Sequence, residues 1–183
     1  MNTINIFQKN WAFTSAESEK PQIKTGAFGP CYVVTFTSKG FAAMAHIDDT
    51  TQVESIKVIF KKFSENSIDV KDIKVIILGG WKSHPESFKW GNKIIKQIKD
   101  AGFENISTKN MFLKSLPIIQ DNSILKKDSH HLGALVDAEK GKTFLLKEFD
   151  QELEQEQFHQ MRLFAQNYGM DLMDVEVPIS QVL

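Results

Sequence analysis

The sequence predicts a layered α/β fold of the α+β type, in which mixed β-sheets are flanked by helices, with an extra helix near the C-terminus. Three features predict this class. Two pairs of strand-like runs enclose tight-turn signals, as β-hairpins do. A continuous apolar run ends at a glycine pair, which is typical of a buried strand. Helical stretches alternate with these strands, and the presence of hairpins favours a mixed sheet over a purely parallel one.

The first predicted elements form a hairpin. Residues 16–22 (AESEKPQ) are polar and predict a loop. Residues 31–37 (CYVVTFT) are rich in β-branched and aromatic side chains and predict a strand. The turn signal Ser-Lys-Gly occupies residues 38–40, and residues 41–47 predict the returning strand. The start of the first strand and the end of the second are therefore expected to lie side by side.

A helix and a buried strand are predicted next. Thr50 or Thr51 can cap a helix that runs to Glu65. Its apolar residues recur at helical spacing, and they are Val53, Ile56, Ile59, Phe60 and Phe63. Residues 73–78 form a continuous apolar run, which predicts a strand covered on both faces.

The second half predicts another helix, a second hairpin and a C-terminal extension. Pro85 is expected to begin a helix that stops before Gly102, as a glycine after a helix C-terminus does. The apolar face of this helix consists of Phe88, Ile94, Ile95 and Ile98. Residues 132–137 and 143–147 predict two strands of a hairpin. A long helix over residues 150–168 and a short strand over 175–178 complete the predicted elements, and the helix is expected to pack on the domain or to bind a protein partner.

Composition predicts a single domain over residues 1–183 and excludes several function classes. The 183 residues include 42% hydrophobic and 25% charged residues, with a net charge of −1, so no basic excess suggests nucleic-acid binding. No apolar run is long enough to cross a membrane, and no classical signal peptide begins the chain. The single cysteine excludes an internal disulfide and a cysteine-rich metal site. A cytoplasmic location is therefore expected, although signal-free secretion would leave no mark on the sequence.

Cys31 and His46 are the candidate catalytic pair. Cys31 lies between a glycine-rich loop and the first hairpin strand, and His46 lies near the end of the second. The hairpin can bring the two together. A neighbouring imidazole can take the proton of a thiol, which ordinarily titrates near a pKa of about 8.5, and can return it to a leaving amine. Thr25 and Asp48 are candidates for orienting the imidazole, Asp48 as a carboxylate.

Glycines near the pair could contribute backbone N–H groups. Gly29 and Pro30 precede Cys31, and Gly79 and Gly80 follow the buried strand. Glycine lets the backbone approach a ligand closely, and its N–H could stabilise an oxyanion. These four residues are the predicted substrate-binding or oxyanion loop. The alternative is that Cys31 is a small buried hydrophobic residue and that the glycines only form turns.

The motifs around this pair resemble those of the CheD family of chemoreceptor glutamine deamidases. The resemblance covers residues 25–34 (TGAFGPCYVV), residues 40–46 (GFAAMAH), residues 74–80 (KVIILGG) and residues 133–143 (GALVDAEKGKT), in the same order over about residues 22–147. It implies a layered fold with mixed sheets and a catalytic set of Thr25, Cys31 and His46.

Several positions depart from the CheD pattern. Pro30 replaces a serine and has no N–H to donate. Ala134 takes the place of an arginine, residues 112–131 resemble an insertion, and the predicted C-terminal helix is additional. The segment Ala-His-Ile-Asp at residues 45–48 is more similar to the protein N-terminal asparagine amidohydrolases, and a more distant resemblance links the cytotoxic necrotizing factor toxins. These departures leave the substrate open.

The resemblance implies a protein amidohydrolase without a metal or cofactor, whose substrate is a protein bearing a Gln or Asn side chain. Cys31 would attack the carboxamide, His46 would move the proton, and water would release the acyl-enzyme. Glutamine is the predicted side chain, and an N-terminal asparagine is the alternative. A second alternative is a non-catalytic binding module on the same scaffold, motivated by Pro30 and Ala134. A sulfur too far from the imidazole for a hydrogen bond, or a thiol of raised pKa, would favour that module.

Overall fold

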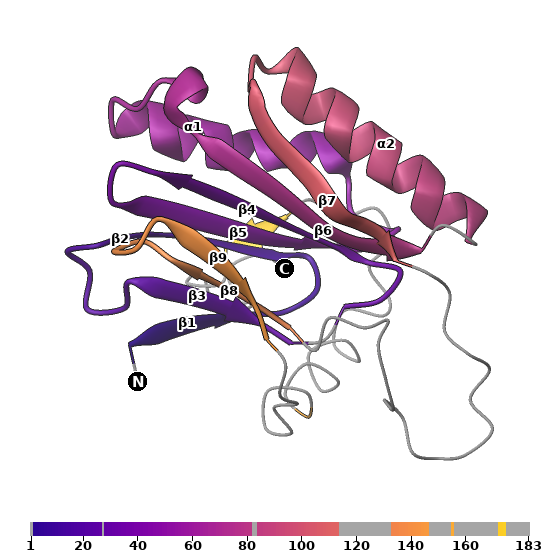
Figure 1. The fold of residues 1–183 in the computed structure, drawn as a ribbon, viewed down its shortest axis with the longest axis horizontal. Helices are drawn as coiled ribbons and strands as arrows, with labels where there is room; N and C mark the ends of the chain where they lie inside the picture. Colours follow the sequence, from indigo (N-terminus) through magenta and orange to yellow (C-terminus); the bar gives the residue numbers. More distant parts are fainter. Residues whose placement is uncertain are drawn as a thin grey trace.

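The computed structural model describes residues 2–26, 28–81, 84–113, 133–146, 155 and 172–174, with the backbone alone at 112, 113 and 173. These residues form two sheets and two α-helices in three layers (Figure 1). The larger sheet has the order β10 (Met173–Asp174), β2 (Asn10–Ser15), β5 (Phe41–Ile47), β4 (Tyr32–Ser38), β6 (Lys74–Trp81) and β7 (Asn105–Leu113). The smaller sheet has the order β1 (Thr3–Ile6), β3 (Gln22–Thr25), β8 (Ala134–Asp137) and β9 (Lys142–Leu145). Helices α1 (Lys57–Glu65) and α2 (Pro85–Asp100) form the third layer.

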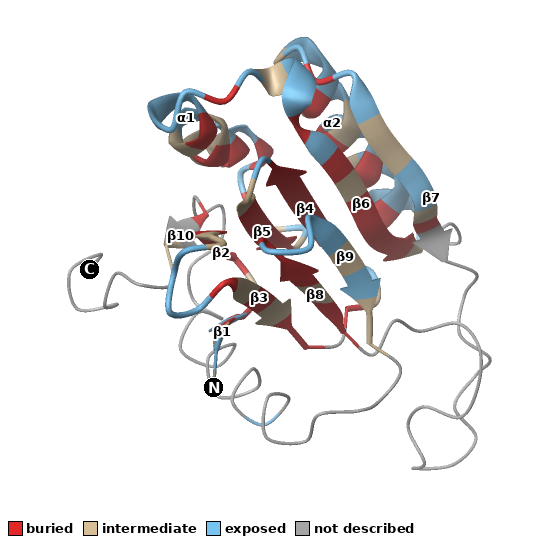
Figure 2. Cartoon of the chain, turned by 60° about the vertical axis from the view of Figure 1, so that its left-hand side comes forward, coloured by how far each residue is buried: buried red, intermediate tan, exposed pale blue. Residues whose placement is uncertain are grey.

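The larger sheet is the middle layer, and its central strands β4 and β5 are buried on both faces, whereas the edge strand β7 is exposed or half-buried over most of its length (Figure 2). Alternating residues of β4 and β5 point to opposite faces. Val34, Phe36 and Ala45 pack with residues of the helices in one hydrophobic core. Val33 and Met44 pack with residues of the smaller sheet in a second core. Both sheets combine parallel with antiparallel pairs, so the predicted fold class is confirmed.

The first predicted hairpin is confirmed. Strands β4 and β5 pair antiparallel from Tyr32 opposite Ile47 to Ser38 opposite Phe41. The turn uses two positive φ angles, 46° at Lys39 and 81° at Gly40. The second hairpin is also formed, by β8 and β9.

The helices differ in detail from the prediction. A 3₁₀ turn over Val53–Ile56 precedes α1, and the hydroxyl of Thr51 bonds to Asp48 instead of capping a helix. The apolar face of α1 packs as expected. Helix α2 begins at Pro85 as predicted, but Phe88 is 42% exposed because it lies off the stripe formed by Ile94 and Ile98.

Strands β1, β2, β3 and β7 were not predicted. Residue 22, expected in a loop, begins β3. Strand β7 follows the second helix, in a segment for which no element was predicted. Strands β1 and β3 have four residues each, which is too short for an alternating pattern to be distinguished from chance. Most of residues 112–131, the predicted helix over 150–168 and the predicted strand over 175–178 lie outside the described residues.

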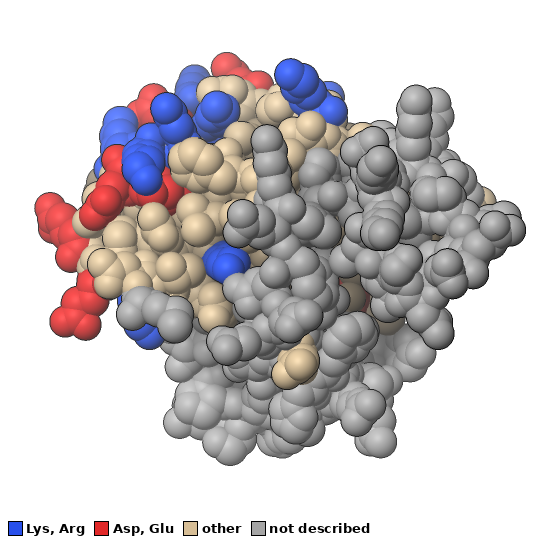
Figure 3. Space-filling view, turned by 60° about the horizontal axis from the view of Figure 1, so that its bottom comes forward, with Lys and Arg blue, Asp and Glu red and all other residues tan. Residues whose placement is uncertain are grey.

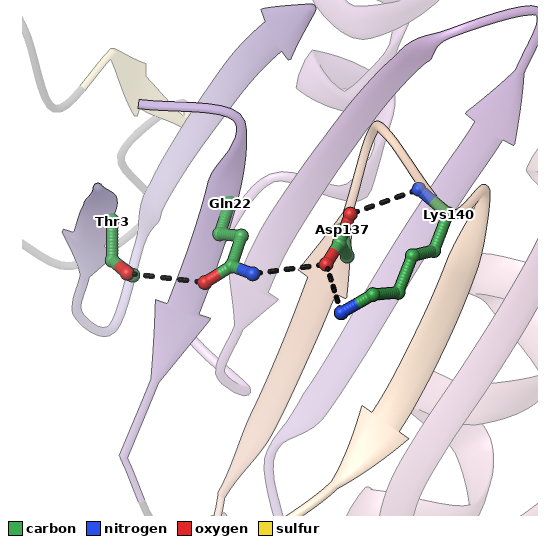
Figure 4. Close-up of polar contacts among 4 residues, drawn as sticks. All are labelled: Thr3, Gln22, Asp137 and Lys140. Carbon is green, nitrogen blue, oxygen red and sulfur yellow. Dashed lines mark hydrogen bonds and ion pairs between the residues drawn. The ribbon is translucent and has the colours of Figure 1, made fainter. Parts of the chain in front are cut away.

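A chain of polar contacts fixes the register of the smaller sheet (Figure 4). Gln22 Nε2 donates to Asp137 Oδ2 at 2.9 Å, and Lys140 contacts the same carboxylate through its backbone N–H and its ammonium. Burial alone would raise the pKa of Asp137, but these donors hold it below its usual value. Because Gln22 lies opposite Asp137, Thr25 lies opposite Ala134 three residues further along.

The surface is mixed in charge, and neither described helix could span a membrane. Lysines and acidic side chains are interspersed on the part of the surface seen in Figure 3, in keeping with the net charge of −1. Among the residues described, no helix has the length and apolar character that a bilayer crossing requires.

Candidate functional site

Cys31 lies in a loop that is bonded to its surroundings on both sides. The hydroxyl of Ser87, in the first turn of α2, donates to the carbonyl of Pro30 at 2.7 Å. The same hydroxyl accepts the backbone N–H of Trp81 at 3.0 Å, and Tyr32 donates its own hydroxyl to the Ser87 carbonyl at 2.6 Å. Ser87 therefore joins the loop before Cys31 to the end of β6.

The glycine pair predicted to approach the site does contact the backbone of Cys31. A Cβ at Gly79, where φ is 89°, would collide with the Cys31 carbonyl oxygen. The N–H of Gly80 donates to the carbonyls of both Gly29 and Cys31, at 3.1 and 3.0 Å. Gly29 itself packs against the indole of Trp81. The close approach requires glycine, but the N–H of Gly80 is committed to these carbonyls.

Thr25 and His46 bridge the two sheets. Thr25 lies on β3 of the smaller sheet and His46 on β5 of the larger one, and both are fully buried. Thr25 Oγ1 lies 2.8 Å from His46 Nδ1. Nε2 of the same imidazole is buried and has no hydrogen-bond partner among the described residues. If Nδ1 donates to Thr25, Nε2 is left as a free proton acceptor.

The sulfur of Cys31 is contacted by a residue that the sequence did not single out. Gln8 Nε2 donates to Cys31 Sγ at 3.2 Å. Gln8 lies in the turn that links β1 to β2 and thus the smaller sheet to the larger. Cys31 as a residue is half-buried and packs against the core between the sheets. Cys31 lies two residues before Val33, which is opposite His46, so both candidate residues belong to the face of the larger sheet that meets the smaller one.

Both candidate groups are neutral at neutral pH. Burial raises the pKa of the Cys31 thiol to about 12, the charge of Asp48 adds to the rise, and the Gln8 amide opposes it. Burial also lowers the pKa of the His46 imidazole to about 4, with Asp48 acting in the opposite direction. The site therefore holds a thiol and a neutral imidazole instead of a thiolate–imidazolium pair.

The structure brings some predicted residues together and leaves others apart. Thr25 contacts His46, and Ala134 lies beside Thr25 on β8. Cys31 and His46 make no hydrogen bond with each other. Asp48 Oδ1 accepts hydrogen bonds from the Thr50 and Thr51 hydroxyls rather than from the imidazole. The carboxylate nevertheless acts on both candidate groups through its charge.

Gln8 and Ser87 are the site residues that sequence reasoning missed. Gln8 could have been found only by predicting β1 and β2 and the turn between them. Ser87 carries a weak signal, since it lies in the first turn of a helix that was predicted correctly. Nothing in the sequence indicates that its hydroxyl joins two loops.

Thr25→Val is expected to destabilise the fold by about 1–3 kcal/mol, because it leaves a buried imidazole nitrogen without its partner. Urea denaturation followed by tryptophan fluorescence measures this loss. Thr25→Ser keeps the hydroxyl and is the matched control, expected to lose much less stability. Equal stability of Thr25→Val and the wild type would show that the contact with Nδ1 contributes nothing.

Two solved structures have a partial likeness to this one. They are YlmD from Geobacillus stearothermophilus, with 15% identity and a TM-score of 0.42, and the hypothetical protein YfiH from Bacillus licheniformis, with 11% identity and a TM-score of 0.40. The matches cover 56% and 58% of this chain, and 50% of the other chain in each case. This chain thus spans about half the length of either protein. A search of curated proteins finds no significant match.

A family model matches nearly the whole chain. The model is that of the protein N-terminal asparagine amidohydrolases, and it matches residues 1–178. The match confirms the resemblance predicted from residues 25–48 to the group that includes these enzymes and the CheD deamidases, and it supports amidohydrolase activity in general. The chain belongs to the protein N-terminal asparagine amidohydrolase family.

Proposed function

We propose that the protein hydrolyses the side-chain carboxamide of an N-terminal asparagine, with Cys31 as nucleophile and His46 as base. The observation that carries this proposal is the buried contact between Thr25 Oγ1 and His46 Nδ1. This contact orients the imidazole, and Nε2, on the sheet face to which Cys31 also belongs, has no partner within the part of the chain that the structure describes. An unpaired buried nitrogen costs free energy, and a role as proton acceptor for the thiol would explain why this cost is retained.

The reaction runs through an acyl-enzyme. His46 Nε2 takes the thiol proton as Cys31 Sγ bonds to the carboxamide carbon, and the C=O electron pair moves to oxygen. As the tetrahedral intermediate collapses, the C–N bond breaks and the same proton goes to the leaving ammonia. Water then attacks the thioester, which yields an aspartate side chain and restores the thiol. No metal or organic cofactor is needed for these steps.

The charges around Cys31 favour a substrate with a free N-terminus. Asp48 and Asp49 both act on the thiol and raise its pKa. The α-ammonium of an N-terminal asparagine is a cation close to the reacting carboxamide, and it would offset these carboxylates. An internal glutamine brings no such charge. The family match points the same way, whereas the motifs shared with CheD favour glutamine.

A non-catalytic binding module remains the second candidate, because Cys31 and His46 are not bonded and the thiol is neutral. Catalytic hydrogen bonds are often long in unliganded enzymes and tighten when the substrate binds. A neutral thiol can also react if its proton leaves during the attack. These two points, with the family match, favour the enzyme.

Three peptides distinguish hydrolysis of an N-terminal asparagine from glutamine deamidation and from binding without catalysis. They share one sequence and carry a free N-terminal asparagine, an acetylated N-terminal asparagine or an internal glutamine. We expect ammonia release from the first peptide only, with conversion of Asn to Asp seen by mass spectrometry. Turnover of the glutamine peptide alone would favour a glutamine deamidase. Binding without turnover of any peptide would favour the binding module.

A further inference from the structure

The side-chain amide of Gln8 is directed at the nucleophilic sulfur. Its Nε2 lies 3.2 Å from Cys31 Sγ, and both side chains are half-buried. A primary amide has two N–H donors, so Gln8 can donate to the sulfur and to a neighbouring atom. The Gln8 amide is therefore placed to donate a hydrogen bond to a group that becomes bonded to this sulfur.

The backbone holds Gln8 in this position. Residues 7–10 form a turn closed by Asn10 N–H to the Phe7 carbonyl at 3.0 Å, and the Asn10 side chain accepts the Phe7 N–H at 3.2 Å. Lys9 has a φ of 64°, a conformation that costs about 1–2 kcal/mol for a residue other than glycine. Its N–H donates to the carbonyl of His46 at 2.8 Å. The turn is thus bonded directly to the residue proposed as the base.

The same turn is connected to the third residue of the proposed set. Strand β1 ends at Ile6, which lies opposite Thr25 in the smaller sheet. The turn follows at once and leads into β2 of the larger sheet. Gln8 is therefore placed relative to Thr25 on one side and His46 on the other.

Three backbone positions near Cys31 offer no free donor. Pro30 has no N–H. The N–H of Gly80 donates to two carbonyls, and that of Trp81 donates to the Ser87 hydroxyl. An oxyanion that forms on a carbon bonded to Cys31 Sγ needs a hydrogen-bond donor, and Gln8 is the side-chain donor in contact with this sulfur.

We propose that Gln8 is a catalytic residue that stabilises the oxyanion of the tetrahedral intermediate, a role that rests on the proposed function. When Sγ bonds to the carboxamide carbon, the thiol proton is on His46 and the negative charge is on the former carbonyl oxygen. That oxygen is two bonds from the sulfur. The Gln8 N–H, which donates to Sγ before the attack, donates to this oxygen afterwards, and the interaction strengthens as the charge develops.

Gln8→Met tests this role because methionine has a similar length and no N–H donor. We expect kcat on the free N-terminal asparagine peptide to fall about 10²-fold, with little change in KM, as for the loss of one oxyanion-hole donor. Gln97→Met, on α2 across the larger sheet from the site, is the matched control and should keep wild-type kcat. Thermal unfolding of both variants checks that the fold is retained.

A second readout uses a peptide whose first residue carries an aldehyde in place of the asparagine carboxamide. The aldehyde adds reversibly to Cys31 and gives a tetrahedral adduct with the same oxygen. Gln8→Met should weaken its inhibition by a similar factor, whereas a residue that only packs against the sulfur would alter inhibition and kcat little. Gln8→Met with wild-type kcat and wild-type inhibition would overturn the role of Gln8 while the proposed function stands. A wild-type protein that releases no ammonia and does not bind the aldehyde would overturn both.

Discussion

Cys31→Ala is expected to abolish ammonia release, with kcat at least about 10⁴-fold below that of the wild type, because no other group can form the acyl-enzyme. The chain has a single cysteine, so no second thiol can replace it. Because the side chain is half-buried and small, its truncation should leave the fold intact. Ammonia release from the free N-terminal asparagine peptide measures the activity, and circular dichroism checks the fold.

Cys31→Ser is the companion variant. A hydroxyl keeps the shape of the site, but it is a much weaker nucleophile beside a base whose pKa is only about 4. We therefore expect this variant to be as inactive as Cys31→Ala. A Cys31→Ala protein that retains wild-type turnover would exclude the thiol mechanism.

His46→Gln should lower kcat by about 10²-fold to 10⁴-fold, the usual contribution of general acid–base catalysis. Glutamine can still bond to Thr25, so the variant removes the base while keeping a polar partner between the sheets. In the wild type, kcat/KM should remain high from neutral pH down to about pH 4, where His46 becomes protonated. A loss of activity centred near the ordinary histidine pKa would contradict the buried environment of this imidazole.

The His46 imidazole also makes the free energy of unfolding depend on pH. His46 has a pKa of about 4 in the folded protein and 6.5 as its unperturbed value, so between these values the unfolded chain binds the extra proton. The free energy of unfolding should therefore fall by about 3 kcal/mol as pH drops from 7 to 4, on account of this residue. Urea denaturation at several pH values measures the fall, and His46→Gln should lack this contribution. This readout does not depend on activity.

The parts of the fold with a strong local pattern could be predicted from the sequence. The hairpin of β4 and β5 combines apolar strands with a turn that requires positive φ, and its predicted ends agree with the structure to one residue. Helix α2 starts at a proline, as expected. His46 lies on β5 and Cys31 directly precedes β4, so the local signals of this hairpin placed both candidate residues.

The rest could not be predicted because it depends on pairing between distant segments. Strands β1 and β3 pair in parallel. Strand β3 is in turn held by a polar contact to β8, more than a hundred residues away in the sequence. Without this sheet, nothing places Thr25 against His46 or Gln8 against Cys31. The raised pKa of the thiol likewise follows from burial between two sheets, which a motif does not reveal.

The single thiol also makes the protein a natural probe of its own local motions. Cys31 Sγ is bonded to the turn over residues 7–10 and packs against the core between the sheets. Because Cys31 is half-buried, its reaction with a thiol reagent should become faster when that turn lifts or the fold unfolds. Labelling rates that respond weakly to urea would report the first event, and rates that respond strongly would report the second. The wild-type chain therefore allows the opening of its candidate site to be timed without an engineered cysteine.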